Sequence, residues 1–201
     1  RAFAVGSATQ ASGARAFASG ERTKATYSYT TAMGYKSEAS NFASTALGRE
    51  TIASGQYATA MGQQTTASQN ASTAMGDGSF ASGNAATAMG SFTEAIGIAS
   101  TAMGQQTKAS GEYSTAMGYT TTASDYNSLV VGRYNLLGST VTNTNFQFST
   151  ENTAFVIGNG TANDSRSDAL TVLFDGTTNI AGAVTCLLYT SDAADDLYRG
   201  D

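Results

Sequence analysis

Small or apolar residues alternate with polar residues in short runs that recur every 14 residues along most of the chain. Each unit holds two runs of period-2 alternation, which predicts two short β-strands per unit and no helix. A glycine marks the same position of ten successive units: Gly6, Gly20, Gly34, Gly48, Gly62, Gly76, Gly90, Gly104, Gly118 and Gly132. A fixed period of this kind is typical of a β-solenoid, in which each unit is one coil stacked on the next.

One face of each predicted strand carries only small residues. Ala stands five positions after each glycine from Gly6 to Gly118, and Thr or Ser stands three positions after it. Ala also stands two positions before the glycine in nine of the ten units. We therefore expect a thin coil lined by Ala, Ser and Thr. The position between the Thr or Ser and the Ala varies freely, so it faces outward, and its candidate binding residues are Ile52, Phe80 and Lys108.

A second set of positions, half a unit after each glycine, predicts a second corner per coil. The residues there are Gly13, Tyr27, Asn41, Gly55, Gln69, Gly83, Gly97, Gly111 and Asp125. Most of these residue types tolerate a left-handed backbone, which is the conformation that we expect at this corner. Tyr27 and Gln69 do not fit that expectation.

Bulky apolar residues occupy the outward face of the second strand. All six methionines of the chain stand directly before a repeat glycine, and stacking would align them in a column with a spacing of about 4.8 Å. The small interior cannot cover this column, so we predict that copies of the chain do. The predicted interface consists of Met33, Leu47, Met61, Met75, Met89, Met103, Met117 and Val131. With Val5, the column offers on the order of 15–25 kcal/mol of apolar burial as an upper figure.

The composition argues against several classes of function. The chain has no His, no Pro, no Trp and a single Cys, Cys186, so an imidazole base, a disulfide and a thiolate zinc site are not expected. Asp164, Asp168 and Asp175 have the sequence context of turn residues, and we predict no catalytic, cofactor or metal residues. The net charge of −5, with scattered basic residues, argues against nucleic acid. No apolar run is long enough to insert into a membrane.

The run Tyr113-Ser-Thr-Ala-Met-Gly118, recurring with Thr-x-Ala-Ser-Gly, resembles the YadA-like head repeats of trimeric autotransporter adhesins. Their usual form is Ser-Val-Ala-Ile-Gly, and here Thr and Met stand in place of Val and Ile. The resemblance implies an all-β, left-handed parallel β-roll that forms a homotrimer. It also implies display outside the outer membrane of a Gram-negative bacterium, and attachment to an extracellular matrix protein, a glycan or another cell-surface ligand.

The 14-residue register ends at Gly132, which divides the chain into three predicted parts. Residues 1–132 form the β-roll head, and residues 133–185 form a short irregular β connector. Within the connector, Phe155–Gly160 and Arg166–Gly176 resemble connectors of fibre proteins that carry an endosialidase-type intramolecular chaperone. Residues 186–201 follow no earlier pattern, and we expect a disordered or artefactual tail.

Three alternative functions fit parts of the pattern. A phage tail fibre would share the connector and the purpose of attachment, and a non-binding spacer would share the repeats. A thin solenoid with ranked Thr could also bind ice, but here the Thr shares its face with bulky Met, which favours burial. Because the chain opens on Arg1 in mid-pattern, we expect an internal fragment, with any export signal or anchor outside it.

Overall fold

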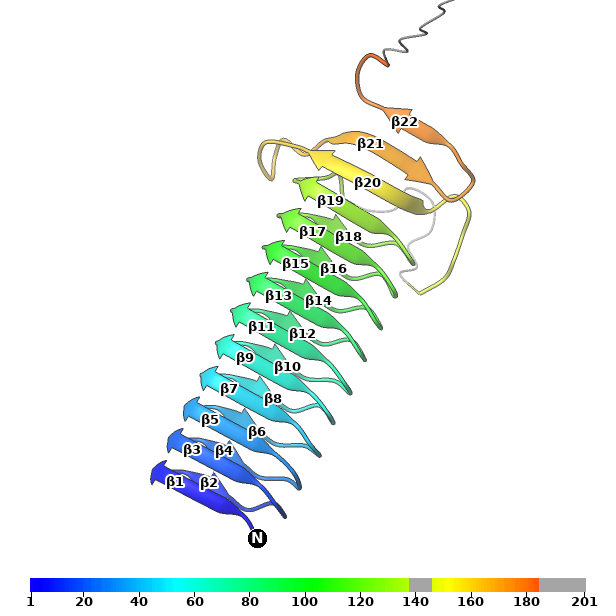
Figure 1. Cartoon of the computed structure of the whole chain (residues 1–201). Coiled ribbons are helices and arrows are strands. Elements are labelled where there is room, and N and C mark those ends of the chain that lie inside the picture. The colour runs from blue at the N-terminus through cyan, green and yellow to red at the C-terminus, as the bar shows by residue number, and fades with distance from the viewer. Residues whose placement is uncertain (138–145, 185–201) are drawn as a thin grey trace, which may run out of the picture.

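The computed structural model describes residues 1–137 and 146–184, which form a slender stack of two-stranded coils (Figure 1). Each coil contributes one five-residue strand and one two-residue strand. The long strands are β1 (Phe3–Ser7), β3 (Phe17–Glu21), β5 (Thr31–Tyr35), β7 (Thr45–Arg49), β9 (Thr59–Gln63), β11 (Thr73–Asp77), β13 (Thr87–Ser91), β15 (Thr101–Gln105), β17 (Thr115–Tyr119) and β19 (Leu129–Arg133). The short strands are β2 (Gln10–Ala11), β4 (Lys24–Ala25), β6 (Glu38–Ala39), β8 (Ile52–Ala53), β10 (Thr66–Ala67), β12 (Phe80–Ala81), β14 (Glu94–Ala95), β16 (Lys108–Ala109) and β18 (Thr122–Ala123).

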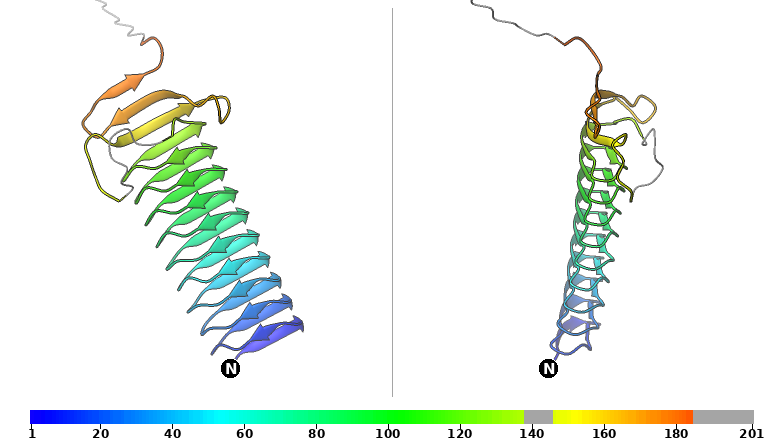
Figure 2. Two further views of the ribbon diagram at one scale, coloured as in Figure 1. Left: turned by 180° about the vertical axis from the view of Figure 1, so that it is seen from behind. Right: turned by 90° about the vertical axis from the view of Figure 1, so that its right-hand side faces the viewer.

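Each strand pairs in parallel with the equivalent strand of the next coil, in a 14-residue register. On β11 and β13, for example, Ala74 lies beside Ala88 and Met75 beside Met89. The long and short strands form two separate sheets that face each other across one thin interior, which the narrow view in Figure 2 makes visible. The predicted all-β solenoid of 14-residue coils is confirmed.

The interior of the roll is built from Ala, Ser and Thr, as the period-2 pattern predicts. Ala88 and Ala95, from the long and short strands of one coil, are fully buried, and so is Thr93 between them. A hydroxyl at the fourth position before the glycine closes each of several corners. Ser72, for instance, donates its Oγ–H to the Gln69 carbonyl oxygen at 2.7 Å. A hydroxyl with such a partner can be buried at little cost, so the coil can remain this thin.

The repeat glycines are required by both backbone conformation and space. Gly76 has a φ of +110°, and a Cβ added there would lie 2.0 Å from the Gly90 carbonyl oxygen of the next coil. No other residue type satisfies both conditions, because a side chain is strained at this φ and overlaps the neighbouring backbone.

The prediction of a left-handed backbone at the half-unit positions is wrong. Gly55 and its equivalents have no positive φ; the left-handed residues stand two positions later, as at Tyr29 with φ +62° and Tyr57 with φ +59°. The amide of Tyr29 donates to the Ala14 carbonyl of the preceding coil at 2.9 Å, and this coil-to-coil bond supports the left-handed residue. At Gly55 the constraint is space, since a Cβ would lie 1.9 Å from the Gln69 carbonyl oxygen.

Three further strands extend the long-strand sheet beyond the last coil: β20 (Thr153–Asn159), β21 (Asp168–Leu173) and β22 (Thr178–Ile180). Strand β20 is parallel to β19 and continues its register, with Val131 beside Ile157 and Gly132 beside Gly158. Strands β21 and β22 then add in antiparallel fashion (Figure 1). The domain boundary at residue 132 stays a prediction, although the long-strand sheet continues across it from β19 to β20. The predicted tail, residues 186–201, lies outside the described residues.

Candidate self-association and binding surfaces

The methionine column lies along one flat side of the roll, on the outer face of the long-strand sheet. We use this name for the nine residues Val5, Met33, Leu47, Met61, Met75, Met89, Met103, Met117 and Val131. From Met33 to Val131, consecutive members are register partners, as Met61 lies beside Met75 and Met103 beside Met117. Ser19 separates Val5 from Met33. Strand β20 adds Ile157 to the same line. The sequence-predicted interface residues are therefore brought together in one continuous apolar stripe.

The column is only partly covered within one chain. Met33 is 41% exposed, and the methionines from Met61 to Met117 are half-buried, because each is flanked by its neighbours in the adjacent coils. The opposite face of the same strands packs on Ala, so the fully buried interior contributes little apolar area per residue. A partner could bury the exposed part of the column further, and the free energy available from this burial is smaller than the upper figure for fully exposed side chains.

The predicted outward residues lie in one line on the outside of the short-strand sheet. Thr66 lies between Ile52 and Phe80 in this line, and Glu94 lies between Phe80 and Lys108. Ile52 and Phe80 are 42% and 40% exposed. Lys108 places its Nζ 3.0 Å from Glu94 Oε2. The line is thus a polar ladder with two isolated apolar side chains, and its role in binding stays a prediction.

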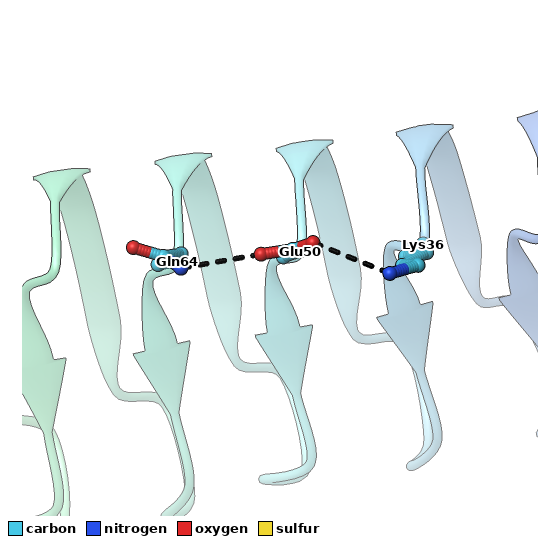
Figure 3. Close-up of polar contacts among 3 residues, drawn as sticks. All are labelled: Lys36, Glu50 and Gln64. Carbon is cyan, nitrogen blue, oxygen red and sulfur yellow. Dashed lines mark hydrogen bonds and ion pairs between the residues drawn. The ribbon is translucent and has the colours of Figure 1, made fainter.

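A second polar ladder, which the sequence analysis did not single out, follows the left-handed corner two residues after the repeat glycine. Lys36 Nζ lies 3.5 Å from Glu50 Oε1, and Gln64 Nε2 donates to Glu50 Oε2 at 3.2 Å (Figure 3). The Gln64 hydrogen bond is the largest cause that holds the pKa of the Glu50 carboxyl below its ordinary value of 4.5; Lys36 adds to it, and desolvation opposes both. The signal for this ladder in the sequence is a pair of opposite charges 14 residues apart, Lys36 and Glu50.

Aromatic side chains gather at the other corner of the coils. Tyr29 and Tyr57, at equivalent positions, flank Phe42, with ring centroids 5.3 Å and 5.6 Å from its ring. Tyr113, at the same position further along, meets Tyr126 at 5.3 Å. The three tyrosines are about half exposed where they cover the coil edge, and the Tyr29 hydroxyl accepts a hydrogen bond from Arg15.

A hollow lies where the last coil meets β20 and β21, and two carboxylates line it. Asp125 Oδ2 accepts the Thr153 N–H at 2.9 Å, which ties the last coil to β20. Asp168 accepts the Leu136 N–H at 3.0 Å. Burial raises the pKa of this carboxyl, and the Leu136 hydrogen bond offsets part of that rise. Both carboxylates have structural partners of this kind.

Two features are absent from the described residues: a cluster of metal-ligating side chains and a membrane-spanning helix. Residues 1–137 and 146–184 contain no group of three or more His, Cys, Asp or Glu that could hold a metal ion. The same part of the chain has no helix that could span a membrane. Asp175 accepts the Thr177 N–H at 2.7 Å, a contact typical of a turn residue.

The surfaces described above belong to a thin parallel β-solenoid with a partly uncovered apolar column, which is the architecture of a structural repeat domain. The YadA head domain repeat (2 copies) matches the chain over residues 1–22, 28–51, 53–79, 71–93, 81–107, 95–120 and 109–135. The chain therefore belongs to the family of YadA-like adhesin heads, which form homotrimers in general and are exposed at the cell surface. No curated protein matches the chain significantly. The resemblance of residues 133–185 to a chaperone-linked connector stays a prediction.

Proposed function

We propose that this chain is the attachment head of a homotrimeric fibre on the outer side of a bacterial outer membrane. The observation that carries the proposal is the methionine column, a continuous apolar stripe whose own chain leaves it partly exposed. Contiguous exposed apolar surface on a soluble domain marks an interaction site. Membership of the YadA-like head family supports the trimeric arrangement and the adhesive purpose.

In the proposed trimer the methionine column lies at or near the threefold axis, with its eight residues from Met33 to Val131 in the interface. The expected drive is burial of those side chains, each worth roughly 1.5–3 kcal/mol when fully covered, less the part already covered within the chain. In a cyclic trimer every pair of neighbouring chains makes the same contact. One sequence pattern is therefore enough to cover the column of every copy.

Light scattering on the purified chain tests the assembly. The double variant Met75→Asp/Met89→Asp should dissociate, because it would bury six carboxylates of the trimer without partners. The matched control Ile52→Asp/Phe80→Asp adds the same charge on the outside of the short-strand sheet and should remain a trimer. A stable, folded wild-type monomer would overturn this part of the proposal.

The attachment role is tested separately, with trimer that has passed the first test. We expect binding to an extracellular matrix protein, a glycan or a cell surface, and a loss of binding in Ile52→Thr/Phe80→Thr/Lys108→Ala. A trimer that binds none of these ligands would be a spacer. The genes on either side of the coding sequence distinguish a further alternative: a stalk and membrane anchor are expected, whereas capsid or baseplate genes would indicate a phage tail fibre.

A further inference from the structure

A second column runs beside the methionine column on the same outer face, at the third position before each repeat glycine. In seven consecutive coils, from Thr31 to Thr115, this position is always Thr, and we call it the threonine column. Strand pairing places each member beside the next, as Thr73 lies beside Thr87. The two columns together form the face that the proposed trimer would bury.

The uniformity of these seven coils creates a problem of alignment. Each coil presents one Thr and one Met, or Leu47 in one case, and adjacent coils are about 4.8 Å apart. A neighbouring copy displaced along the axis by one or two coils would meet almost the same side chains. Repetitive strands specify their register weakly for this reason, so the uniform coils alone cannot align the copies.

Both ends of the threonine column differ from its middle. At one end it continues as Phe3 and Phe17, whose rings stack with centroids 5.6 Å apart and an interplanar angle of 6°. At the other end, Leu129 lies beside Phe155 of β20, which lies beside Val172 of β21. At the end near β20 the face therefore changes from alternating polar and apolar positions to bulky apolar residues. At the other end Phe3 and Phe17 take the place of Thr, while Ser19 interrupts the methionine column.

The methionine column also continues into β20 and β21, at the C-terminal end of the roll. Its continuation runs from Val131 through Ile157 of β20 to Leu170 of β21, again by direct register pairing. In β20 and β21 both columns are therefore apolar, and their four residues, Phe155, Ile157, Leu170 and Val172, are part-exposed on the chain. The antiparallel strands thus extend the proposed self-association face beyond the coils.

We propose that the bulky residues at the ends of the threonine column fix the axial register in which copies of this chain pack together. The proposal rests on the proposed homotrimer. The partner is a second copy of the chain because an identical roll carries the same bulky residues, from Phe17 to Leu129, the same number of coils apart. In register, bulky residues meet their equivalents. One coil out of register, Leu129 would face Thr115 and Phe17 would face Thr31, which leaves gaps or overlaps that cost stability.

Disulfide trapping measures the register directly. Two chains, both with Cys186→Ser, carry Met61→Cys and Met89→Cys respectively and are co-expressed with distinguishable tags. In register, each cysteine lies near its own equivalent, while the two sites are two coils apart, about 10 Å along the axis and beyond disulfide reach. We expect crosslinks only between chains with the same cysteine. A crosslink between position 61 and position 89 reports a two-coil slip.

The decisive variant replaces all five bulky residues by the Thr of the middle coils: Phe3→Thr, Phe17→Thr, Leu129→Thr, Phe155→Thr and Val172→Thr. We expect trimers that now give the 61-to-89 crosslink at a yield comparable with that of the like-to-like crosslinks. As a rescue, Thr59→Leu and Thr73→Phe added to this variant should suppress the slipped crosslink, because they create a new bulky step in mid-roll. If the five residues only supported folding, the two added side chains would not suppress the slipped crosslink.

The matched control removes apolar side chains from elsewhere on the roll: Ile52→Thr, Phe80→Thr and Ile98→Thr, all exposed and none in either column. It should leave the wild-type crosslinking pattern unchanged.

Trimers of the five-residue variant that stay in register, or a rescue without effect, would overturn the inference while the homotrimer stands. A wild-type chain that does not self-associate would instead contradict the proposed function. If the five-residue variant does not fold, the two substitutions Phe3→Thr and Phe17→Thr are combined with Leu129→Thr alone, which leaves β20 and β21 unaltered.

Discussion

The Asn135 side chain pairs with Thr122 as if it were the backbone of one more short strand. Its Oδ1 accepts the Thr122 N–H at 2.8 Å, and its Nδ2 donates to the Thr122 carbonyl oxygen at 2.9 Å. Thr122 belongs to β18, the last strand of the short-strand sheet, whereas the long-strand sheet continues into β20. A side-chain amide thus caps an edge that would otherwise be open to pairing with another chain.

Removing this cap should destabilise the last coil. Asn135 is 3% exposed, so Asn135→Ala leaves a buried amide and carbonyl of Thr122 without partners, at a cost of about 1–3 kcal/mol. Hydrogen exchange of the Thr122 amide should accelerate, together with a lower unfolding midpoint in urea. Asn84→Ala, at an exposed corner, is the control and should change stability by less than about 0.5 kcal/mol. Equal effects of the two substitutions would contradict the capping role.

The two glycines of one corner should respond differently to Ala. Gly76→Ala combines backbone strain with overlap of the Gly90 carbonyl, and roughly 3–5 kcal/mol of destabilisation is expected. Gly78, with φ +62°, stands where adjacent coils hold Gln64 and Phe92 in the same left-handed conformation. A Cβ there meets only the Phe92 ring, so Gly78→Ala should cost about 1 kcal/mol. Urea midpoints followed by circular dichroism measure both, and a similar loss in both variants would contradict the steric account.

The Lys36–Glu50–Gln64 ladder should make a small contribution to stability that depends on pH. Because the folded-state pKa of Glu50 is below its ordinary value of 4.5, the contribution is present above pH 4.5 and is lost as the pH falls through the folded-state pKa. The difference in melting temperature between wild type and Glu50→Gln should shrink from pH 7 to pH 3. It should also shrink with added salt, since the group is exposed. Glu112→Gln, which removes a carboxylate without an ion pair to a described residue, is the comparison.

Two carboxyls near the end of the roll should respond to pH in opposite directions. Burial raises the pKa of Asp168, so its ionisation costs stability as the pH rises through the folded-state pKa, and Asp168→Asn should stabilise the end of the roll at pH 7 but not at pH 3. Backbone and side-chain hydrogen bonds from Thr177 lower the pKa of Asp175 below its ordinary value of 3.8. Asp175→Asn should therefore destabilise at pH 7, and this loss should shrink as the pH falls below 3.8. Melting curves of the two variants at both pH values check the signs. The same sign for both variants at pH 7 would contradict these assignments.

The repeat made most of the architecture predictable from sequence. A two-residue alternation places Ala88 and Met89 on opposite faces of one strand, and a 14-residue period brings Met75 beside Met89 once the coils stack. Neither conclusion depends on distant contacts, because each coil has the same local pattern and the same neighbours. The outward line of Ile52 and Phe80 followed from the same reasoning.

The sequence by itself therefore determined the strands, the thin interior and the apolar column, since these depend on local alternation and a constant period. Only the tertiary structure decided the corners. There the left-handed backbone of Tyr29 is supported by a hydrogen bond from its N–H to the Ala14 carbonyl of another coil, so no glycine marks this position in the sequence. It also decided the return of Phe155–Asn159 to the roll register, although Leu129-Val-Val-Gly132 and Phe155-Val-Ile-Gly158 share a pattern that hinted at it. The Asn135 cap had no such signal in the sequence. Its partner is the open edge of β18, and that edge exists only after the coils have stacked.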